Sequence, residues 1–384
     1  MCGVNGKWAQ SMRLDVRSIE SGEVREFYIC GVGVDGDDPA GSARRIFAAI
    51  ADEVRQRHAR IARERVFVPD GQFEAFRAAR RRAYGNVADE MPVDWLHAGA
   101  ADGAGGVQVH AIRGIGEWTA LKASNHTIGW TFERDGYRWA MTGAVTASSV
   151  DGMDAPAEAH GAFETAGSIL RQANMDLRHL ARTWIYMHDI LGWYGEFNEV
   201  RNKIFTASGM LRAGDASLVP ASTGMGVSPI DGKKITIELF AVSGGGKDCI
   251  KRFAAAGKQR CAYEYGSAFA RAAEAPTPAG TTLFVSGTAA IDLEGRTMHV
   301  GDAAAQTNTT LVNVVSVLSN AGYDAGSVVQ AMAYCKTPEI AQIFRDRFAP
   351  TYAWPWVIVI GDVCRDDLLF EAEVTACKSK GKGS

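Results

Sequence analysis

The sequence has few cysteines and no pairing pattern among them. Seven cysteines are scattered over 384 residues, and no two of them form a Cys-x-x-Cys pair. An odd and dispersed set argues against a disulfide framework and against the usual zinc and redox motifs. The eight histidines also never occur at the spacing of metal ligands. We therefore expect a protein without disulfide bonds and without a bound metal.

The sequence also lacks a large excess of charge and any long apolar run. The 41 Lys and Arg residues nearly balance the 44 Asp and Glu residues, and the formal net charge is −3. This balance offers no electrostatic attraction for nucleic acid or for an anionic membrane surface. No signal-peptide pattern and no stretch of membrane-spanning length occurs. We expect a cytoplasmic protein that binds small molecules, and neither nucleic acid nor a membrane.

Two familiar catalytic or nucleotide-binding motifs are missing or broken. Residues 31–36 fit the pattern GxGxxG, but Asp35, Asp37 and Asp38 would place negative charge where a dinucleotide pyrophosphate lies. A GxSxG nucleophile elbow does not occur. The sequence therefore favours neither dinucleotide binding nor hydrolysis by an elbow serine.

A repeated strand pattern is the most informative feature that the sequence does contain. An apolar strand that ends in a small polar residue and then glycine occurs three times, at residues 27–31, 139–143 and 283–287. A repeat of this kind indicates several copies of one folding unit. We place the copies at residues 1–118, 119–250 and 251–377, followed by a disordered tail at residues 378–384.

Each copy continues in the same way. Two helical patterns separated by a short apolar strand follow the first strand, and an alternating strand closes the copy. The closing strands contain residues 107–110, 235–238 and 370–373. The resulting order β, β, α, β, α, β, β predicts an α+β fold, in which a half-buried sheet carries helices on one face.

Four segments of the third copy resemble a known family. They read YEYGSAFARA, LFVSGTAAI, AYCKTPEIA and DVCRDDLLFEAEV. These segments resemble the Rid (YjgF-like) proteins, whose small α+β subunits assemble as trimers with sites in the clefts between subunits. The whole chain resembles the chorismatases, in which one chain imitates that trimer. The resemblance implies three tandem Rid-like units that form a monomeric pseudo-trimer.

The resemblance also implies a reaction, the cleavage of chorismate to pyruvate and a ring carboxylate without a cofactor. Two alternatives remain: a Rid-type imine deaminase and a non-catalytic ligand-binding protein. The arginine that holds the substrate carboxylate in Rid deaminases would fall at Trp356 in the third copy and near Ala221 in the second. Because neither copy keeps that arginine, the sequence disfavours deamination.

Chorismate is an enol ether, so its cleavage can begin with protonation of the enolpyruvyl methylene by an acid. Glu371 follows the apolar residues 368–370, where loss of water would raise its pKa. We predict that Glu371 is this acid. The aligned patterns place Gln108 and Thr236 at its position in the other copies, so only one cleft would be active. Glu373 shares the face of Glu371, but Glu238 in the second copy matches it, which favours a structural role.

The two carboxylates of chorismate require cationic partners, and the planar guanidinium of arginine suits them. Arg271 is the first candidate, because it lies in the segment that lines the Rid cleft. The same resemblance suggests Tyr265 as a hydroxyl donor, and Ser286 and Gly287 as residues of the cleft wall. Arg345 is a weaker candidate on the second helix of the third copy.

Cys364 precedes Glu371 by seven residues and is the last candidate. In chorismatases this position and that of Gly287 separate two product classes. The combination of cysteine and glycine resembles the 3-hydroxybenzoate synthases, and not the hydrolases that form a trans-dihydrodiol acid. We therefore predict 3-hydroxybenzoate as the ring product, with the hydrolase reaction as the alternative, and a catalytic role for Cys364.

Overall fold

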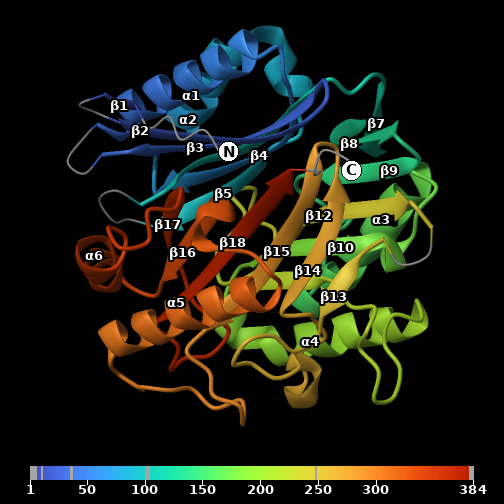
Figure 1. Ribbon diagram of the computed structural model, residues 1–384, viewed down its shortest axis with the longest axis vertical. Helices are drawn as coiled ribbons and strands as arrows, with labels where there is room; N and C mark the ends of the chain where they lie inside the picture. The colour runs from blue at the N-terminus through green and yellow to red at the C-terminus, as the bar shows by residue number, and fades with distance from the viewer. Residues whose placement is uncertain (1–6, 10–11, 35–37, 100–103, 247–248, 380–384) are drawn as a thin grey trace.

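The computed structural model describes residues 7–9, 12–34, 38–99, 104–246 and 249–379. In these ranges the strands form three sheets of six strands each, and each sheet comes from one continuous part of the chain. Figure 1 shows the three sheets packed around a common centre, with the long helices on the outside of the molecule. Among the described residues, no helix combines the length and the apolar character that crossing a membrane requires.

The elements recur in the same order in each unit. The first unit contains β1 (Lys7–Ala9), β2 (Met12–Ser21), β3 (Val24–Gly33), α1 (Pro39–Gln56), β4 (Arg60–Pro69), α2 (Phe73–Tyr84), β5 (Asp94–Gly99) and β6 (Gly106–Arg113). The second contains β7 (Trp118–Ala123), β8 (His126–Arg134), β9 (Tyr137–Thr142), α3 (Ala155–Gln172), β10 (Leu180–Met187), α4 (Ile190–Ala207), β11 (Ala221–Met225) and β12 (Ile235–Gly244). The third contains β13 (Lys251–Phe253), β14 (Ala272–Thr277), β15 (Gly280–Ala289), α5 (Ala303–Asn320), β16 (Val328–Cys335), α6 (Pro338–Arg347), β17 (Trp356–Ile360) and β18 (Phe370–Ser379).

Strand order confirms the three tandem copies. The first and third sheets run β1-β2-β3-β6-β4-β5 and β13-β14-β15-β18-β16-β17, and the second has the corresponding order β7-β8-β9-β12-β10-β11. In each sheet the last pair is parallel, and every other neighbouring pair is antiparallel. The prediction of an α+β chain with three diverged copies is therefore correct, including the first copy, whose sequence matches the others least well.

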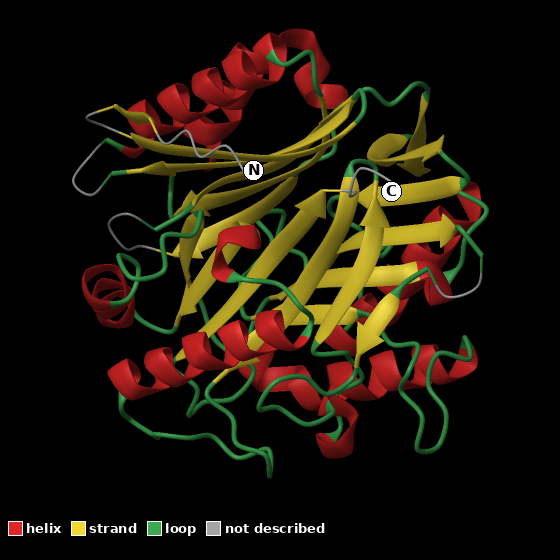
Figure 2. Cartoon of the chain, viewed as in Figure 1, coloured by secondary structure: helices red, strands yellow, loops and turns green. Residues whose placement is uncertain are grey.

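The long helix of each unit packs on its own sheet through an apolar stripe. In α5, Leu311, Val314 and Leu318 are fully buried and occupy one helix face. The helix begins where the side chain of Asp302 accepts a hydrogen bond from Ala305 N–H at 3.0 Å, which satisfies a free amide of the first turn. Figure 2 shows the helices on the outer faces, so that the opposite sheet faces turn toward one another.

The expectation of half-buried sheets is wrong. Every residue of β10 and of β16 is buried, and β4 and β6 are buried over most of their length. The inner sheet faces pack against each other in the middle of the molecule, where Phe67 meets Tyr186 and Trp184 meets Phe284, with ring centroids 5.9 Å apart in both pairs. A chain that folds as its own trimer therefore buries both faces of its central strands.

Backbone bridges close the three units into a ring. Leu96 pairs with Pro229 between units one and two, Gly226 with Asp362 between units two and three, and Gly105 with Ile358 between units three and one. Every unit thus meets both of the others through main-chain contacts. This arrangement is the pseudo-trimer that the repeats predicted.

The registers of the central strands define which residues are equivalent in the three units. Gly106, Thr236 and Glu371 lie opposite Phe67, Tyr186 and Tyr334. Gln108 lies opposite Arg65 and is equivalent to Glu373, so its assignment to the position of Glu371 was wrong by two residues. The error has a simple cause: alternation in a strand has a period of two, and a shift of two residues leaves the pattern unchanged.

The end of the chain also differs from the expectation. Lys378 and Ser379 belong to β18, which pairs with β15 up to Ser379 opposite Gly280. The prediction of disorder is therefore wrong for these two residues. Residues 380–384 lie outside the described part of the chain.

Candidate active site

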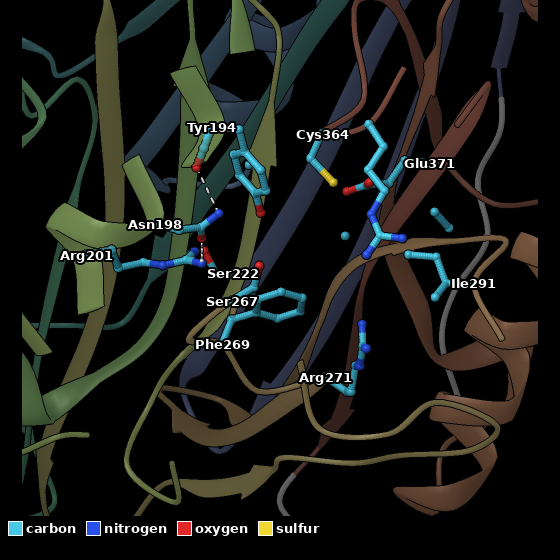
Figure 3. Close-up of a pocket in the computed structure, with 14 residues that line it drawn as sticks. Tyr194, Asn198, Arg201, Ser222, Ser267, Phe269, Arg271, Ile291, Cys364 and Glu371 are labelled. Atoms are coloured by element: carbon cyan, nitrogen blue, oxygen red, sulfur yellow. Dashed lines mark hydrogen bonds between the residues drawn. The ribbon is translucent and has the colours of Figure 1, made fainter. Parts of the chain in front are cut away.

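A pocket of about 210 Å³ lies between the second and third units, and it contains Glu371. Its wall from the second unit is formed by α4 and β11, and its wall from the third unit by β15, β18 and three connecting segments (Figure 3). The pocket is lined by Tyr194, Asn198, Arg201, Ser222, Gly224, Ser267, Phe269, Arg271, Gly287, Ala289, Ile291, Cys364, Arg365 and Glu371. Polar and cationic side chains therefore converge on a small cavity from both units.

Glu371 is the buried acid of this pocket. It occupies the second position of β18, and only 6% of its surface is exposed. Burial and the neighbouring charge of Glu373 raise its pKa from 4.5 to about 8, while Arg271 and Arg182 act in the opposite direction. At neutral pH its carboxyl group is therefore mostly protonated, which is the state that a general acid requires.

Gly287 makes room for that carboxyl group. A Cβ atom at this position would overlap Glu371 Oε1 and would lie 3.0 Å from Thr223 Cγ2. The amide of Gly287 donates a hydrogen bond of 2.9 Å to Thr223 Oγ1, which ties the third unit to the second. The residue predicted as part of the cleft wall is thus in contact with the acid, and its lack of a side chain determines where the acid lies.

Ser286 is not part of the pocket wall. Its hydroxyl donates to the carbonyl of Ala270 at 2.6 Å and accepts from Ser222 N–H at 2.8 Å. The side chain is fully buried and joins the two units behind the wall. The structure therefore does not place Ser286 among the residues that line the pocket, and backbone groups use both the donor and the acceptor function of its hydroxyl.

Arg271 lines the pocket, as the sequence predicted. It is 3% exposed, its Nε donates to the carbonyl of Arg260 at 2.9 Å, and its guanidinium lies 5.2 Å from the ring centroid of Phe269. These contacts fix the plane of the guanidinium. A guanidinium that lines the pocket with a fixed plane is suited to a substrate carboxylate.

Sequence reasoning missed two further arginines in the same pocket. Arg201 comes from α4 of the second unit and donates to Asn198 Oδ1 at 2.5 Å. Arg365 comes from the segment before β18 and donates to the carbonyl of Gly295 at 2.6 Å. Both arginines could have been found from the sequence. Arg365 lies inside the DVCRDDLLFE segment. Arg201 belongs to the preceding unit, which must contribute residues to a cleft between two units.

The local conformation of α4 explains how it reaches the pocket. Asp189 precedes the helix with φ of 51°, and the helical geometry is interrupted at Trp193, whose Nε1 donates to the carbonyl of His188 at 2.8 Å. After this kink Tyr194, Asn198 and Arg201 follow at spacings of four and three residues, so they share one helix face. Figure 3 shows the three side chains on the same side of the pocket, across from Glu371.

Cys364 and Tyr194 border the acid as neutral groups. Burial and the charge of Glu371 raise the pKa of the Cys364 thiol to about 12, and burial raises the pKa of Tyr194 to about 12 as well. A thiol with this pKa is not a thiolate at neutral pH, so it is a poor nucleophile. Cys364 can act there only through its shape and as a weak hydrogen-bonding group.

The two remaining candidates lie elsewhere. Arg345 lines another cleft, between the third and first units, together with Arg13, Trp354 and Trp356. The prediction failed because α6 faces the first unit, whereas the corresponding helix of the second unit, α4, faces Glu371. Tyr265 belongs to the short helix Ala262–Tyr265, and its side chain lies outside what the structure describes.

Equivalent positions in the other clefts carry no acid. Gly106 and Thr236 stand where the third unit has Glu371. Among the residues that the structure describes, no cluster of three or more His, Cys, Asp and Glu side chains could hold a metal ion. The geometry therefore singles out the cleft between units two and three as the one with an acid at this position.

Comparison with known proteins agrees with this picture. Residues 267–377 match the family described as endoribonuclease L-PSP. A chorismatase from Streptomyces hygroscopicus is 30% identical over 217 residues, which cover 50% of this chain and 60% of that protein. The 3-aminoacrylate deaminase RutC from Acinetobacter baylyi is 31% identical over 102 residues, which cover 26% of this chain and 81% of that protein.

Solved structures support the fold. A crystal structure of chorismatase aligns with a TM-score of 0.57 and 24% identity, covering 75% of this chain and 87% of the other. At this identity the similarity establishes the fold alone. In sequence, the match spans less than two thirds of the length of the curated chorismatases, at 60% and 63%.

Proposed function

We propose that this chain, which has the Rid-like fold and is similar to the chorismatases, is a chorismatase that cleaves chorismate into pyruvate and a ring carboxylate. The observation that carries the proposal is the buried carboxyl group of Glu371, whose pKa is raised to about 8, in a pocket that also contains three arginines. A dianionic enol ether needs both features, cations for its carboxylates and an acid for its enolpyruvyl group.

Binding places the substrate between the two walls of the pocket. Arg271 and Arg365 of the third unit and Arg201 of the second unit provide guanidinium groups for the two carboxylates. The enolpyruvyl methylene then lies toward Glu371, and the ring lies beside Cys364 and Gly287. Fixing both carboxylates also orients the reacting carbon, which reduces the entropy that proton transfer would otherwise cost.

Proton transfer starts the reaction. Glu371 gives its proton to the enolpyruvyl methylene, which becomes a methyl group, and the ether carbon becomes an oxocarbenium ion. Glu371 is left as a carboxylate close to this cation, so the charge that develops in the transition state is stabilised electrostatically. The bond between the ring carbon and the ether oxygen then breaks, and pyruvate leaves.

The ring chemistry decides the second product. In the 3-hydroxybenzoate branch the oxygen of the ring's own hydroxyl group forms a bond to the ring carbon that loses pyruvate, and the hydroxyl proton returns to Glu371. The bond of that oxygen to its original ring carbon then breaks. The ring aromatises as the hydrogen on the carbon that now carries the oxygen is lost as a proton and the oxygen takes up a proton. Chorismate then yields pyruvate and 3-hydroxybenzoate without net uptake of water. In the hydrolase branch one water molecule is consumed and a trans-dihydrodiol acid forms. The neutral thiol of Cys364 and the missing side chain of Gly287 support the first branch.

Incubation with chorismate tests the function. We expect pyruvate and 3-hydroxybenzoate in equal amounts, identified by an enzymatic pyruvate assay and by chromatography against authentic standards. Formation of a dihydrodiol acid in place of 3-hydroxybenzoate would show that the enzyme cleaves chorismate by the hydrolase reaction. Unchanged chorismate, combined with turnover of small imino acids, would replace the proposal by a Rid-type deaminase.

The pH dependence follows from the raised pKa of Glu371. The acid must be protonated in the free enzyme, so kcat/KM should be constant below about pH 8 and should fall about tenfold per pH unit above it. The fall of kcat/KM occurs toward high pH, because the active form of the enzyme is the one in which Glu371 carries its proton. A pH profile of kcat/KM with chorismate measures this limb. A profile that falls toward low pH from neutrality would mean that Glu371 acts as a base.

Substitution of Cys364 tests the choice of product. Cys364→Ala should keep chorismate consumption and pyruvate release, because the thiol does not take part in the first proton transfer. It should lower the fraction of 3-hydroxybenzoate and produce a dihydrodiol acid instead, since the space that it leaves can admit water beside the ring. Chromatographic product ratios measure this effect. Unchanged ratios would show that Cys364 does not influence the product.

A further inference from the structure

A buried ion network lies where the three units meet, next to the proposed acid. Arg65 of the first unit binds Glu238 of the second through Nε at 2.6 Å and Nη2 at 2.7 Å. Its Nη1 lies 3.5 Å from Glu373 Oε1 of the third unit. Arg182 of the second unit binds the other oxygen of Glu373, and Arg63 lies 3.2 Å from Glu238 Oε2. Every unit thus contributes at least one charged group.

The network reaches the wall of the active pocket through one hydroxyl. Arg182 donates to Thr223 Oγ1 at 2.5 Å, and the same oxygen accepts the amide of Gly287 at 2.9 Å. Gly287 is the residue against which the Glu371 carboxyl group lies. A continuous set of contacts therefore runs from arginines of the first and second units to the position of the acid.

Glu373 stands between the network and the acid. It is two residues from Glu371 on β18, and strand geometry places both side chains on one face. Only 4% of its surface is exposed, and two arginines from different units hold it. Transfer of a carboxylate from water to the protein interior is unfavourable, and the two ion pairs with arginines of different units offset that cost.

We propose that Glu373 is a positioning residue for the acid: its carboxylate, held by Arg65 and Arg182 on the same strand face as the buried carboxyl group of Glu371, disfavours a second negative charge there. The inference rests on the proposed function for its catalytic meaning, but the relation between the two charges does not depend on the substrate. It also gives the first two units a role: they supply the arginines that stabilise the charge beside the acid of the third.

The other groups around Glu371 determine the expected directions. The charge of Glu373 raises the pKa of Glu371, and Arg271 and Arg182 lower it. Neutral Cys364 and Tyr194 face the carboxyl group from the segment before β18 and from α4, and the remaining cations of the pocket are Arg201 and Arg365. Loss of Glu373 removes a negative charge and leaves Arg182 without its carboxylate, so both effects favour ionised Glu371.

Titration of the Glu371 carboxyl group tests the proposal without substrate. In protein labelled with ¹³C at glutamate side-chain carboxyls, Glu371→Gln identifies the signal by its loss. We expect that signal to titrate near pH 8 in the wild type. It should titrate about 1 to 3 units lower in Glu373→Gln, because a charge at this range shifts a pKa by that amount. The upper limb of the pH profile with chorismate should move by the same amount.

Arg182→Met is the second variant, and it should shift the titration in the opposite direction. A general loosening that admits water would lower the pKa of Glu371 in both variants. In Arg182→Met the ion pair of Glu373 with Arg65 remains, so the loss of the Arg182 cation raises the pKa of Glu371. Opposite shifts therefore support the proposal, and so does a raised value in Arg182→Met if Glu373→Gln does not fold. A signal that stays unchanged in Glu373→Gln, or that falls in Arg182→Met, would overturn it. If the carboxyl group shifts as expected but chorismate is not cleaved, the charge relation stands and the proposed function fails.

Discussion

Glu371→Gln is expected to lower kcat for chorismate by about 10² to 10⁴-fold, because general acid catalysis contributes on that order. The amide keeps the shape of the side chain but has no proton of suitable acidity to give. The substitution also removes no charge at neutral pH, since the carboxyl group is protonated there. Binding of chorismate should therefore remain close to normal. Steady-state kinetics, together with a binding measurement on the inactive variant, provides both values.

Glu339→Gln is the matched control for this substitution. Glu339 is an exposed residue in the first turn of α6 in the same unit, and it does not line the pocket. Its replacement changes the same chemical group and should leave turnover unchanged. Near-normal turnover in Glu371→Gln would mean that another residue protonates the substrate, and Glu373 would then be the next candidate.

Arg271→Met should lower kcat/KM for chorismate by about ten- to a hundredfold. Hydrogen bonds to charged groups contribute about 1.5 to 3 kcal/mol, and each 1.4 kcal/mol corresponds to a factor of ten. Methionine keeps the apolar stem against Phe269 and removes the cation that faces the substrate. Most of the loss should appear in KM, because the carboxylate contact exists before and during the reaction.

A second signature separates the loss of charge from a loss of structure. Arg271 lowers the pKa of Glu371, so Arg271→Met should move the upper limb of the pH profile to higher pH. The control is Arg345→Met, which removes a guanidinium from the cleft between the third and first units and should leave kcat/KM unchanged. Equal effects of the two substitutions would show that Arg271 does not bind the substrate.

The elements of the fold were predictable because they repeat. A strand followed by helix, strand, helix and closing strand is visible in each copy, and the structure has β3, β9 and β15 and then β6, β12 and β18 at those places. Full burial of β10 and β16 was not predictable from one unit, since it arises when the inner faces of three sheets meet. Alignment of the closing strands by alternation alone failed at Gln108, because a shift of two residues leaves the alternation of side chains in a strand unchanged.

The site was predictable where it depends on one unit, and less so where it depends on two. Glu371, Arg271, Gly287 and Cys364 all lie in the third unit, and the structure brings them together in one pocket. The contribution of α4 was missed because the second unit enters the site only through the assembly of the three sheets. Arg345 was misplaced for the same reason, since each helix of this kind faces the cleft of the following unit.

The most direct test of the account is a crystal structure of Glu371→Gln with chorismate, because this variant should bind the substrate without consuming it. The account predicts chorismate in the cleft between the second and third units. Its enolpyruvyl methylene should lie within about 3.5 Å of the substituted side chain. Its carboxylates should lie against Arg271 and at least one of Arg201 and Arg365. Chorismate bound in the cleft lined by Trp354, Trp356 and Arg345, or bound in the first cleft with its enolpyruvyl group turned away from residue 371, would contradict the account.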